Sequence, residues 1–111
     1  MVRDGVGFVE LADVAADRAL RGTPYLEFLR VSSMSAGLYA LPAGSRDGQL
    51  PHRQDELYYV VRGKARMRAG TEDRSIGPGT LVFVAASVEH RFYQIEEDLE
   101  VLVFFAPAEA E

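Results

Sequence analysis

The sequence predicts an all-β domain of the jelly-roll barrel type, with one short helix near its start. Beyond Gly22 and Pro24 the chain consists of short apolar or alternating runs separated by clusters of turn-forming residues, as in all-β domains. The runs are evenly spaced, which favours a rolled or closed sheet because such sheets hide their edges. A length of 111 residues fits one domain.

The N-terminal segment, residues 1–24, is expected to contain the helix. Its apolar side chains recur on roughly one face at helical spacing, at Phe8, Leu11, Val14, Ala15 and Leu20. Residues 25–111 are expected to form the barrel domain, with strands at 25–31, 36–41, 56–62, 65–70, 80–84, 90–95 and 99–105. Turn clusters separate them, at 42–48, 62–64, 70–73 and 77–79. We expect the acidic end, residues 109–111, to fray.

Composition limits the kinds of site and partner. The chain has no cysteine, so a disulfide framework is excluded and a metal would need nitrogen and oxygen ligands. A net charge of -5 without a basic stripe argues against a nucleic-acid partner. The longest apolar run, from Leu81 to Val88, is too short to span a bilayer, and no signal-peptide pattern opens the chain. We therefore expect a cytoplasmic protein without a membrane partner.

The two histidines of the chain each lie beside a turn, near the start of an expected strand. His52 precedes Glu56 by four residues, and His90 ends a run that opens at Gly79. Because side chains alternate between the two faces of a strand, His52 and Glu56 share a face. An inward row that carries His52 and Glu56 can therefore face another that carries His90. We expect two imidazoles and one carboxylate to meet inside the barrel.

These two segments resemble the paired motifs of the cupin superfamily, G(X)5HXH(X)3-4E(X)6G and G(X)5PXG(X)2H(X)3N. In the first motif the second histidine, the glutamate and the last glycine fall on His52, Glu56 and Gly63, while Leu50 stands at the first histidine. In the second motif the first glycine and the histidine fall on Gly79 and His90, while Ala85, Ser87 and Gln94 replace the proline, glycine and asparagine. The resemblance spans about residues 37–107. It implies a small cupin, a double-stranded β-helix.

The resemblance also implies that His52, Glu56 and His90 hold a divalent transition metal. Two imidazoles and one carboxylate suit iron, manganese, zinc, nickel or copper and leave coordination positions open. Gln49 is a candidate further ligand in place of the missing histidine, if a bulge turns it inward. The alternative for each histidine is a partly buried structural side chain with a hydrogen bond, and the alternative for Glu56 is a surface charge.

A barrel of this size has room for one small ligand. We expect its pocket to be lined by aromatic and apolar residues, namely Tyr39, Tyr58, Met67, Phe83 and Phe92, with core packing as the alternative for the aromatic ones. The strand that carries Glu56 also presents an apolar second face, so both of its faces need cover. A second subunit would cover the second face in a homodimer; the alternative is cover by residues 8–31 of the same chain.

Two functions from different classes fit these observations. The first is a metal-dependent enzyme that acts on a small organic molecule in the barrel interior. The resemblance implies dioxygenase, isomerase, cyclase or decarboxylase chemistry for it, and no nucleophile motif in the sequence offers a route without metal. The second is a non-catalytic module that binds or senses a small molecule, because a fold does not determine a function.

Overall fold

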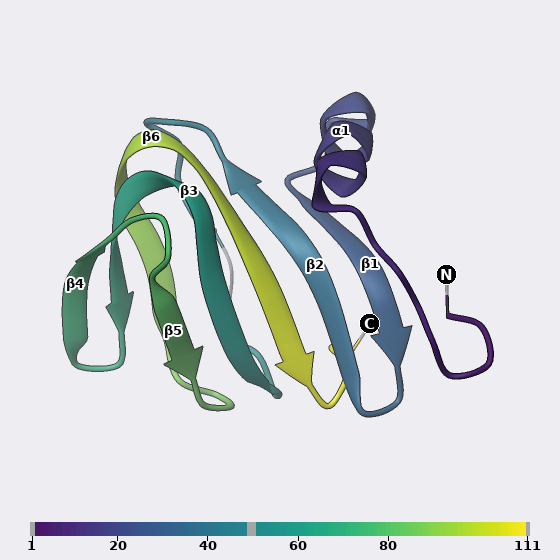
Figure 1. Ribbon diagram of the computed structural model, residues 1–111. Helices are drawn as coiled ribbons and strands as arrows, with labels where there is room; N and C mark the ends of the chain where they lie inside the picture. Colours follow the sequence, from purple (N-terminus) through teal and green to yellow (C-terminus); the bar gives the residue numbers. More distant parts are fainter. Residues whose placement is uncertain (1, 49–50, 111) are drawn as a thin grey trace.

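The computed structural model of the chain describes residues 2–48 and 51–110. Within these residues, one antiparallel six-stranded sheet rolls around a core, and one helix lies beside it (Figure 1). The elements in chain order are α1 (Leu11–Arg21), β1 (Tyr25–Val31), β2 (Met34–Leu41), β3 (Asp55–Ala69), β4 (Glu72–Ile76), β5 (Leu81–Val84) and β6 (His90–Ala106). Hydrogen-bonded neighbours follow the order β1-β2-β6-β3-β4, and β5 pairs with β3. The expected all-β jelly-roll class with a helix near its start is confirmed.

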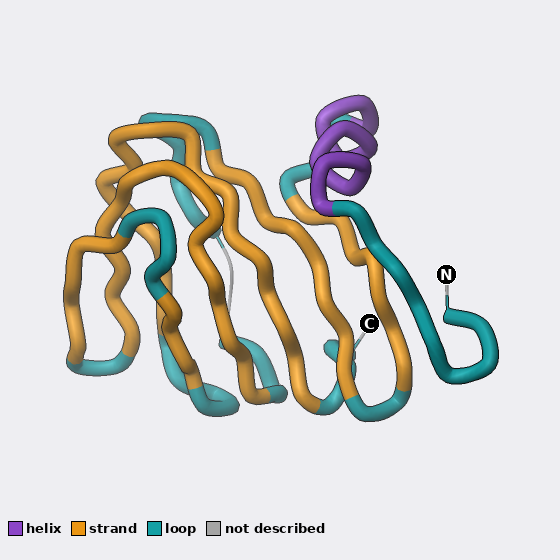
Figure 2. The backbone as a smooth tube through the Cα atoms, in the orientation of Figure 1, coloured by secondary structure: helices purple, strands orange, loops and turns teal. Residues whose placement is uncertain are grey.

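Two long strands, β3 and β6, pair along their whole length and bend together (Figure 2). The first half of β3 lies against the last half of β6, where Tyr58 is opposite Val103. The second half of β3 lies against the start of β6, where Met67 is opposite Phe92. One continuous ladder therefore forms both sides of the barrel, with β5 added to the first half of β3 and β4 to the second.

The bend lies where we expect a turn between two separate strands, at residues 62–64. Gly63 has φ +98°, and a side chain on it would overlap the backbone of Asp98 and Leu99 on β6. Only glycine combines this backbone conformation with such a close approach. The pairing register shifts on both sides of it, so the ladder bends there without ending. The expectation of separate strands at 56–62 and 65–70, and at 90–95 and 99–105, is wrong for this reason.

Strand β4 was not expected from the sequence. Four of its five side chains are exposed and polar, so no apolar alternation marks it. It forms because it pairs with the second half of β3, from Ala65 opposite Ile76 to Ala69 opposite Glu72. The expected turn at 70–73 is the tight end of this hairpin.

Helix α1 packs against β1 and β2 and ends at Gly22, whose φ of +69° forms a left-handed C-cap. Val14 is its buried residue. Phe8 and Leu20, which we expect on the buried face, are instead 91% and 87% exposed. The helix begins at Leu11, so Phe8 lies before it and does not share its periodicity. With 11 residues α1 is too short to cross a membrane, and no other helix among the described residues is long and apolar enough to do so.

The core lies inside the rolled sheet, on the faces that alternation predicts. The row Leu99, Val101, Val103 and Phe105 of β6 is at most 3% exposed. On β3, Met67 is buried, whereas the neighbouring Arg66 is half-buried and Arg68 is exposed. The inner face of the first half of β3 carries Glu56, Tyr58 and Val60, all at most 2% exposed. A carboxylate therefore lies in the interior of the barrel.

Candidate metal centre

Two loops fix the ends of the strands that carry the three expected ligands. His52 lies in the loop before β3, Glu56 is the second residue of β3, and His90 is the first residue of β6. The Ser87 amide, in the loop before β6, donates to the carbonyl of His52 over 2.6 Å. Ser87 has φ +68°, a conformation that favours the glycine of the cupin motif at this position. The two histidine-bearing segments are thus joined through the backbone.

The three side chains converge. One ligand atom from each of His52, Glu56 and His90 can be chosen so that all three lie within 4.8 Å of one another. Oε1 of Glu56 lies 3.3 Å from Nε2 of His90 and 3.8 Å from Nε2 of His52. Glu56 and the side chain of His90 are almost fully buried, and the side chain of His52 is 21% exposed. The site therefore opens to solvent on the side of His52.

Each imidazole has an oxygen acceptor at its other nitrogen. Nδ1 of His90 lies 2.8 Å from the carbonyl oxygen of Val88, and Nδ1 of His52 lies 3.1 Å from Oε2 of Glu109. These oxygens can only accept a hydrogen bond, so in a neutral ring they favour the proton on Nδ1 and a lone pair on Nε2. Both Nε2 lone pairs would then face the same carboxylate.

This arrangement leaves buried polar atoms unsatisfied. Among the described residues, Nε2 of His90 and Oε2 of Glu56 have no hydrogen-bond partner. Buried polar atoms in native proteins nearly always have one, and two acceptors that face each other need a proton or a cation between them. Two imidazole nitrogens and a carboxylate form a donor set that divalent transition metals prefer. The residues present therefore fit a metal ion.

Burial raises the pKa of Glu56 above its ordinary value. The hydrogen bond from Tyr58 is the largest influence in the opposite direction, followed by the charges of His90 and His52. A cation bound at the site would favour the carboxylate form for the same electrostatic reason. Gln49, the expected further ligand, and Leu50, at the missing histidine, lie outside the described residues.

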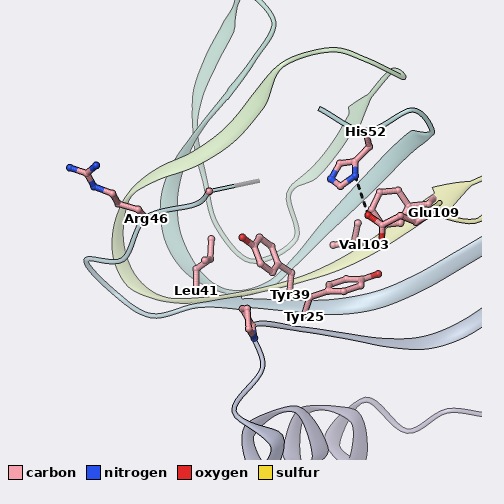
Figure 3. A pocket seen from close by; sticks show the side chains of 10 residues that line it. Tyr25, Tyr39, Leu41, Arg46, His52, Val103 and Glu109 are labelled. Atoms are coloured by element: carbon pink, nitrogen blue, oxygen red, sulfur yellow. Dashed lines mark ion pairs between the residues drawn. The ribbon is translucent and has the colours of Figure 1, made fainter. Parts of the chain in front are cut away.

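A cavity of about 440 Å³ adjoins the site on the side of His52 (Figure 3). Its walls are mainly apolar and aromatic, formed by Pro24, Tyr25, Tyr39, Leu41, Gly48, His52, Val103, Phe105 and Glu109, with Arg46 at the rim. The guanidinium of Arg46 points away from the cavity (Figure 3). The Asp47 carboxylate accepts hydrogen bonds from the Tyr39 hydroxyl and the Phe92 amide, which hold the loop after β2 across the barrel.

Of the five residues expected to line the pocket, Tyr39 contributes to this cavity. Tyr58, Met67 and Phe92 are at most 3% exposed and pack in the core, the alternative considered for the aromatic ones. Phe83 is 64% exposed on the outer face, which corrects its expected position. The reason is register: Val84, one residue later, lies opposite Glu56 and takes the inward position.

Tyr25 and Glu109 are two of the cavity residues that were not expected from the sequence. The ring of Tyr25 crosses β2 at Gly37, where a side chain would overlap it, and its hydroxyl is buried without a hydrogen-bond partner among the described residues. Glu109 lies beyond β6, in the segment expected to fray. Its amide donates to Oγ of Ser35, and its carbonyl accepts from Arg30. A glycine diagonal to an aromatic residue on the neighbouring strand could have indicated Tyr25, whereas no sequence pattern indicates Glu109.

Known proteins share this sequence pattern and this fold. The family model of the cupin domain matches residues 37–105. An uncharacterized protein of Streptomyces coelicolor is 49% identical over 100 residues, which cover 90% of this chain and 95% of that protein. Among solved structures, the TT1209 protein of Thermus thermophilus has a TM-score of 0.73 at 24% identity and covers 93% of this chain and 99% of its own.

An enzyme is among the proteins of similar fold. The DMSP lyase of Ruegeria pomeroyi has a TM-score of 0.67 at 22% identity, covering 79% of this chain and 49% of its own. At such identity the likeness concerns the fold alone, and this chain spans about half the length of that enzyme. The family model, by contrast, includes Glu56 and His90 in the region that it matches. By this match, which covers more than half of its residues, the chain belongs to the cupin family.

Proposed function

We propose that this cupin binds a divalent transition metal through His52, Glu56 and His90 and is a metal-dependent enzyme for a small organic molecule. The observation that carries the proposal is the buried pair of acceptors, Nε2 of His90 and Oε1 of Glu56, 3.3 Å apart. The Nδ1 contact of His90 with Val88 makes a proton on its Nε2 unfavourable in the neutral ring. A cation between the two atoms resolves the conflict.

Three protein ligands leave coordination positions open, as in catalytic rather than structural metal sites. The bound metal would polarise a substrate oxygen or activate water or dioxygen, consistent with dioxygenase, isomerase or cyclase chemistry. The side chains around the site would orient the ligands and exclude water. Tyr58 donates to Glu56 and keeps its carboxylate oriented, and Val103 and Phe105 exclude water from the inner wall.

The cavity favours a small, partly apolar ligand with an acceptor oxygen. Its walls offer mainly hydrocarbon and aromatic surface, and the buried hydroxyl of Tyr25 is a donor without a protein partner among the described residues. Burial raises the pKa of Tyr25, so this hydroxyl keeps its proton and can donate. Small aromatic acids should raise the melting temperature of the metal-loaded protein more than sugars do. Selective stabilisation by sugars would contradict this preference.

Metal analysis of purified protein tests the proposal most directly. Wild type, His52→Ala, Glu56→Ala and Glu89→Ala would each be incubated with Zn²⁺, desalted and analysed for metal. We expect about one Zn²⁺ per chain in wild type and in Glu89→Ala, because Glu89 is exposed beside His90, and little in the other two. Equally little metal in all four proteins would refute metal binding. Bound metal that exchanges no ligand with water would favour the non-catalytic binding module.

We also propose that the chain forms a homodimer through the outer face of β3 and β5. Leu57 lies opposite Phe83 and Tyr59 opposite Leu81, and these four side chains are 39% to 64% exposed. Helix α1 packs against β1 and β2, so its cover does not extend to this patch in the described residues. A second copy would bury a contiguous apolar surface of this kind.

Light scattering over a range of protein concentrations tests the dimer. We expect wild type to be a dimer and Phe83→Glu to be a monomer, because a charge would be buried at the centre of the patch. Leu20→Glu is the matched control, since Leu20 is 87% exposed on α1. A wild-type monomer at all concentrations would refute the proposal.

A further inference from the structure

We propose that Glu109, beyond the end of β6, is a positioning residue that holds His52 in the tautomer and orientation needed to bind metal. The inference rests on the proposed metal site. It adds to that site a residue that lies outside the two segments that resemble the cupin motifs. Its geometric basis is the 3.1 Å approach of Glu109 Oε2 to Nδ1 of His52 (Figure 3), whereas Glu56 approaches the other ring nitrogen, Nε2.

The position of Glu109 is determined by contacts of its backbone as well as its side chain. The Glu109 amide donates to Oγ of Ser35 over 2.9 Å, and Ser35 is fully buried on β2. The Glu109 carbonyl accepts from Nη2 of Arg30 on β1 over 2.7 Å. Its carboxylate lines the cavity beside Tyr25 and is 25% exposed. The segment after β6 thus returns across β1 and β2 and delivers one carboxylate to the site.

His52 depends more than His90 on a distant acceptor that orients its ring. His90 is the first residue of β6, its side chain is fully buried, and its Nδ1 faces a carbonyl oxygen two residues away. His52 lies in a loop, and its side chain is partly exposed. A free imidazole interconverts between tautomers and rotates, so a loop histidine without an orienting acceptor is a poorer ligand. A carboxylate that accepts from the far nitrogen of a ligating histidine fixes both and raises its basicity.

The experiment has two readouts, neither of which is catalytic activity. Zn²⁺ affinity would be measured by competition with a fluorescent chelator, and the tautomer of His52 by long-range ¹H–¹⁵N NMR of the metal-free protein. The variants are Glu109→Ala, Glu109→Gln and, as a control with the same loss of charge as the glutamine variant, Glu96→Gln at the exposed bend of β6. Circular dichroism would verify that each variant is folded.

In wild type and in Glu96→Gln we expect His52 to carry its proton on Nδ1. In Glu109→Ala we expect a mixture of tautomers and a roughly 10- to 100-fold weaker Zn²⁺ affinity, the usual cost of losing such a partner. Glu109→Gln keeps an acceptor oxygen, so it should recover part of the tautomer preference and part of the Zn²⁺ affinity. An unchanged tautomer in Glu109→Ala would overturn the inference, even if affinity fell, and so would an unchanged affinity. If wild type bound no Zn²⁺, the proposed function would fail. This result is distinguishable from an unchanged tautomer or an unchanged affinity in Glu109→Ala, which would overturn only the role of Glu109.

Discussion

Two polar clusters of this barrel, one inside and one outside, are organised in opposite ways. Inside, His90 and Glu56 face each other at 3.3 Å, and one polar atom of each is left without a hydrogen-bond partner among the described residues. Outside, the Asp73 carboxylate on β4 accepts from the Tyr93 hydroxyl over 2.6 Å and pairs with Arg66 and Arg68 over 3.2 Å. The inner cluster is incomplete, whereas the outer one is saturated.

This is the difference that we expect between the proposed binding site and a structural contact. A buried acceptor without a donor costs free energy, and a ligand that completes the group removes this cost. The outer cluster instead joins β4 to β3 and β6. Four of the five residues of β4 are exposed, so this strand makes few core contacts and the surface cluster provides a side-chain contact in their place. Substitutions in the two clusters should therefore act on different quantities: metal affinity inside, and stability without metal outside.

Glu56→Gln should have the largest effect and should change the two quantities in opposite directions. Loss of a residue that only hydrogen-bonds to a metal ligand costs about 10- to 100-fold in metal affinity. Glu56 is itself a proposed ligand, so we expect its loss to lower Zn²⁺ affinity by more than about 100-fold. Metal-free protein should gain about 1–3 kcal/mol at neutral pH, since the amide can donate to Nε2 of His90 and carries no charge. Chelator competition and urea unfolding would measure the two effects.

The gain in stability of metal-free Glu56→Gln over wild type should increase as the pH rises above 4.5. Burial raises the folded-state pKa of Glu56, so the folded state holds its proton above pH 4.5, where the unfolded chain releases it. The contribution of Glu56 to the stability of metal-free wild type therefore falls as the pH rises from 4.5 through the folded-state pKa, and the glutamine variant lacks this contribution. A constant difference between the two proteins across this range would contradict the assignment of Glu56 to the interior.

Metal addition should stabilise the protein by an amount that depends on concentration. A ligand that binds the folded state alone contributes about 2.7 kcal/mol at 100 times its dissociation constant. We expect Zn²⁺ to raise the melting temperature of wild type and a chelator to reverse the rise. Asp73→Asn should show the same rise as wild type, because the outer cluster takes no part in binding. A rise that is equally large in His90→Ala would locate the bound metal elsewhere.

Tyr58→Phe should have a smaller effect on the inner cluster. The variant removes the hydrogen bond that lowers the pKa of Glu56 and leaves the fully buried ring in place. We expect Zn²⁺ affinity to fall about tenfold, the lower end for an outer partner of a metal ligand. Tyr59→Phe is the matched control, because Tyr59 is the next residue on β3 and is 39% exposed on the outer face. Equal losses in the two variants would exclude a role for the Tyr58 hydroxyl.

The resemblance to the cupin motifs predicted that His52, Glu56 and His90 meet, and side-chain alternation was consistent with it, because each lies at or near the start of a strand whose inward row is apolar. It could not place Phe83, because all four residues of β5 are apolar and either face could be the inner one. The register against Glu56 decides, and register arises from pairing between distant segments. Glu109 escaped prediction for a similar reason: it follows the last strand, and its contacts are with Ser35 and Arg30, far away in the chain.

Asp73→Asn should have the smallest effect, one confined to stability. The Tyr93 hydrogen bond, with smaller contributions from Arg68 and Arg66, lowers the pKa of Asp73 below its ordinary value of 3.8. The stabilisation is therefore present above pH 3.8 and is lost as the pH falls through the folded-state value. Urea unfolding should find the variant less stable than wild type at pH 7, by less in high salt because exposed charges are screened, and similar to it in strong acid. A variant that also lost Zn²⁺ affinity would break the separation between the two clusters, because it would couple the outer contact to the inner site through β3.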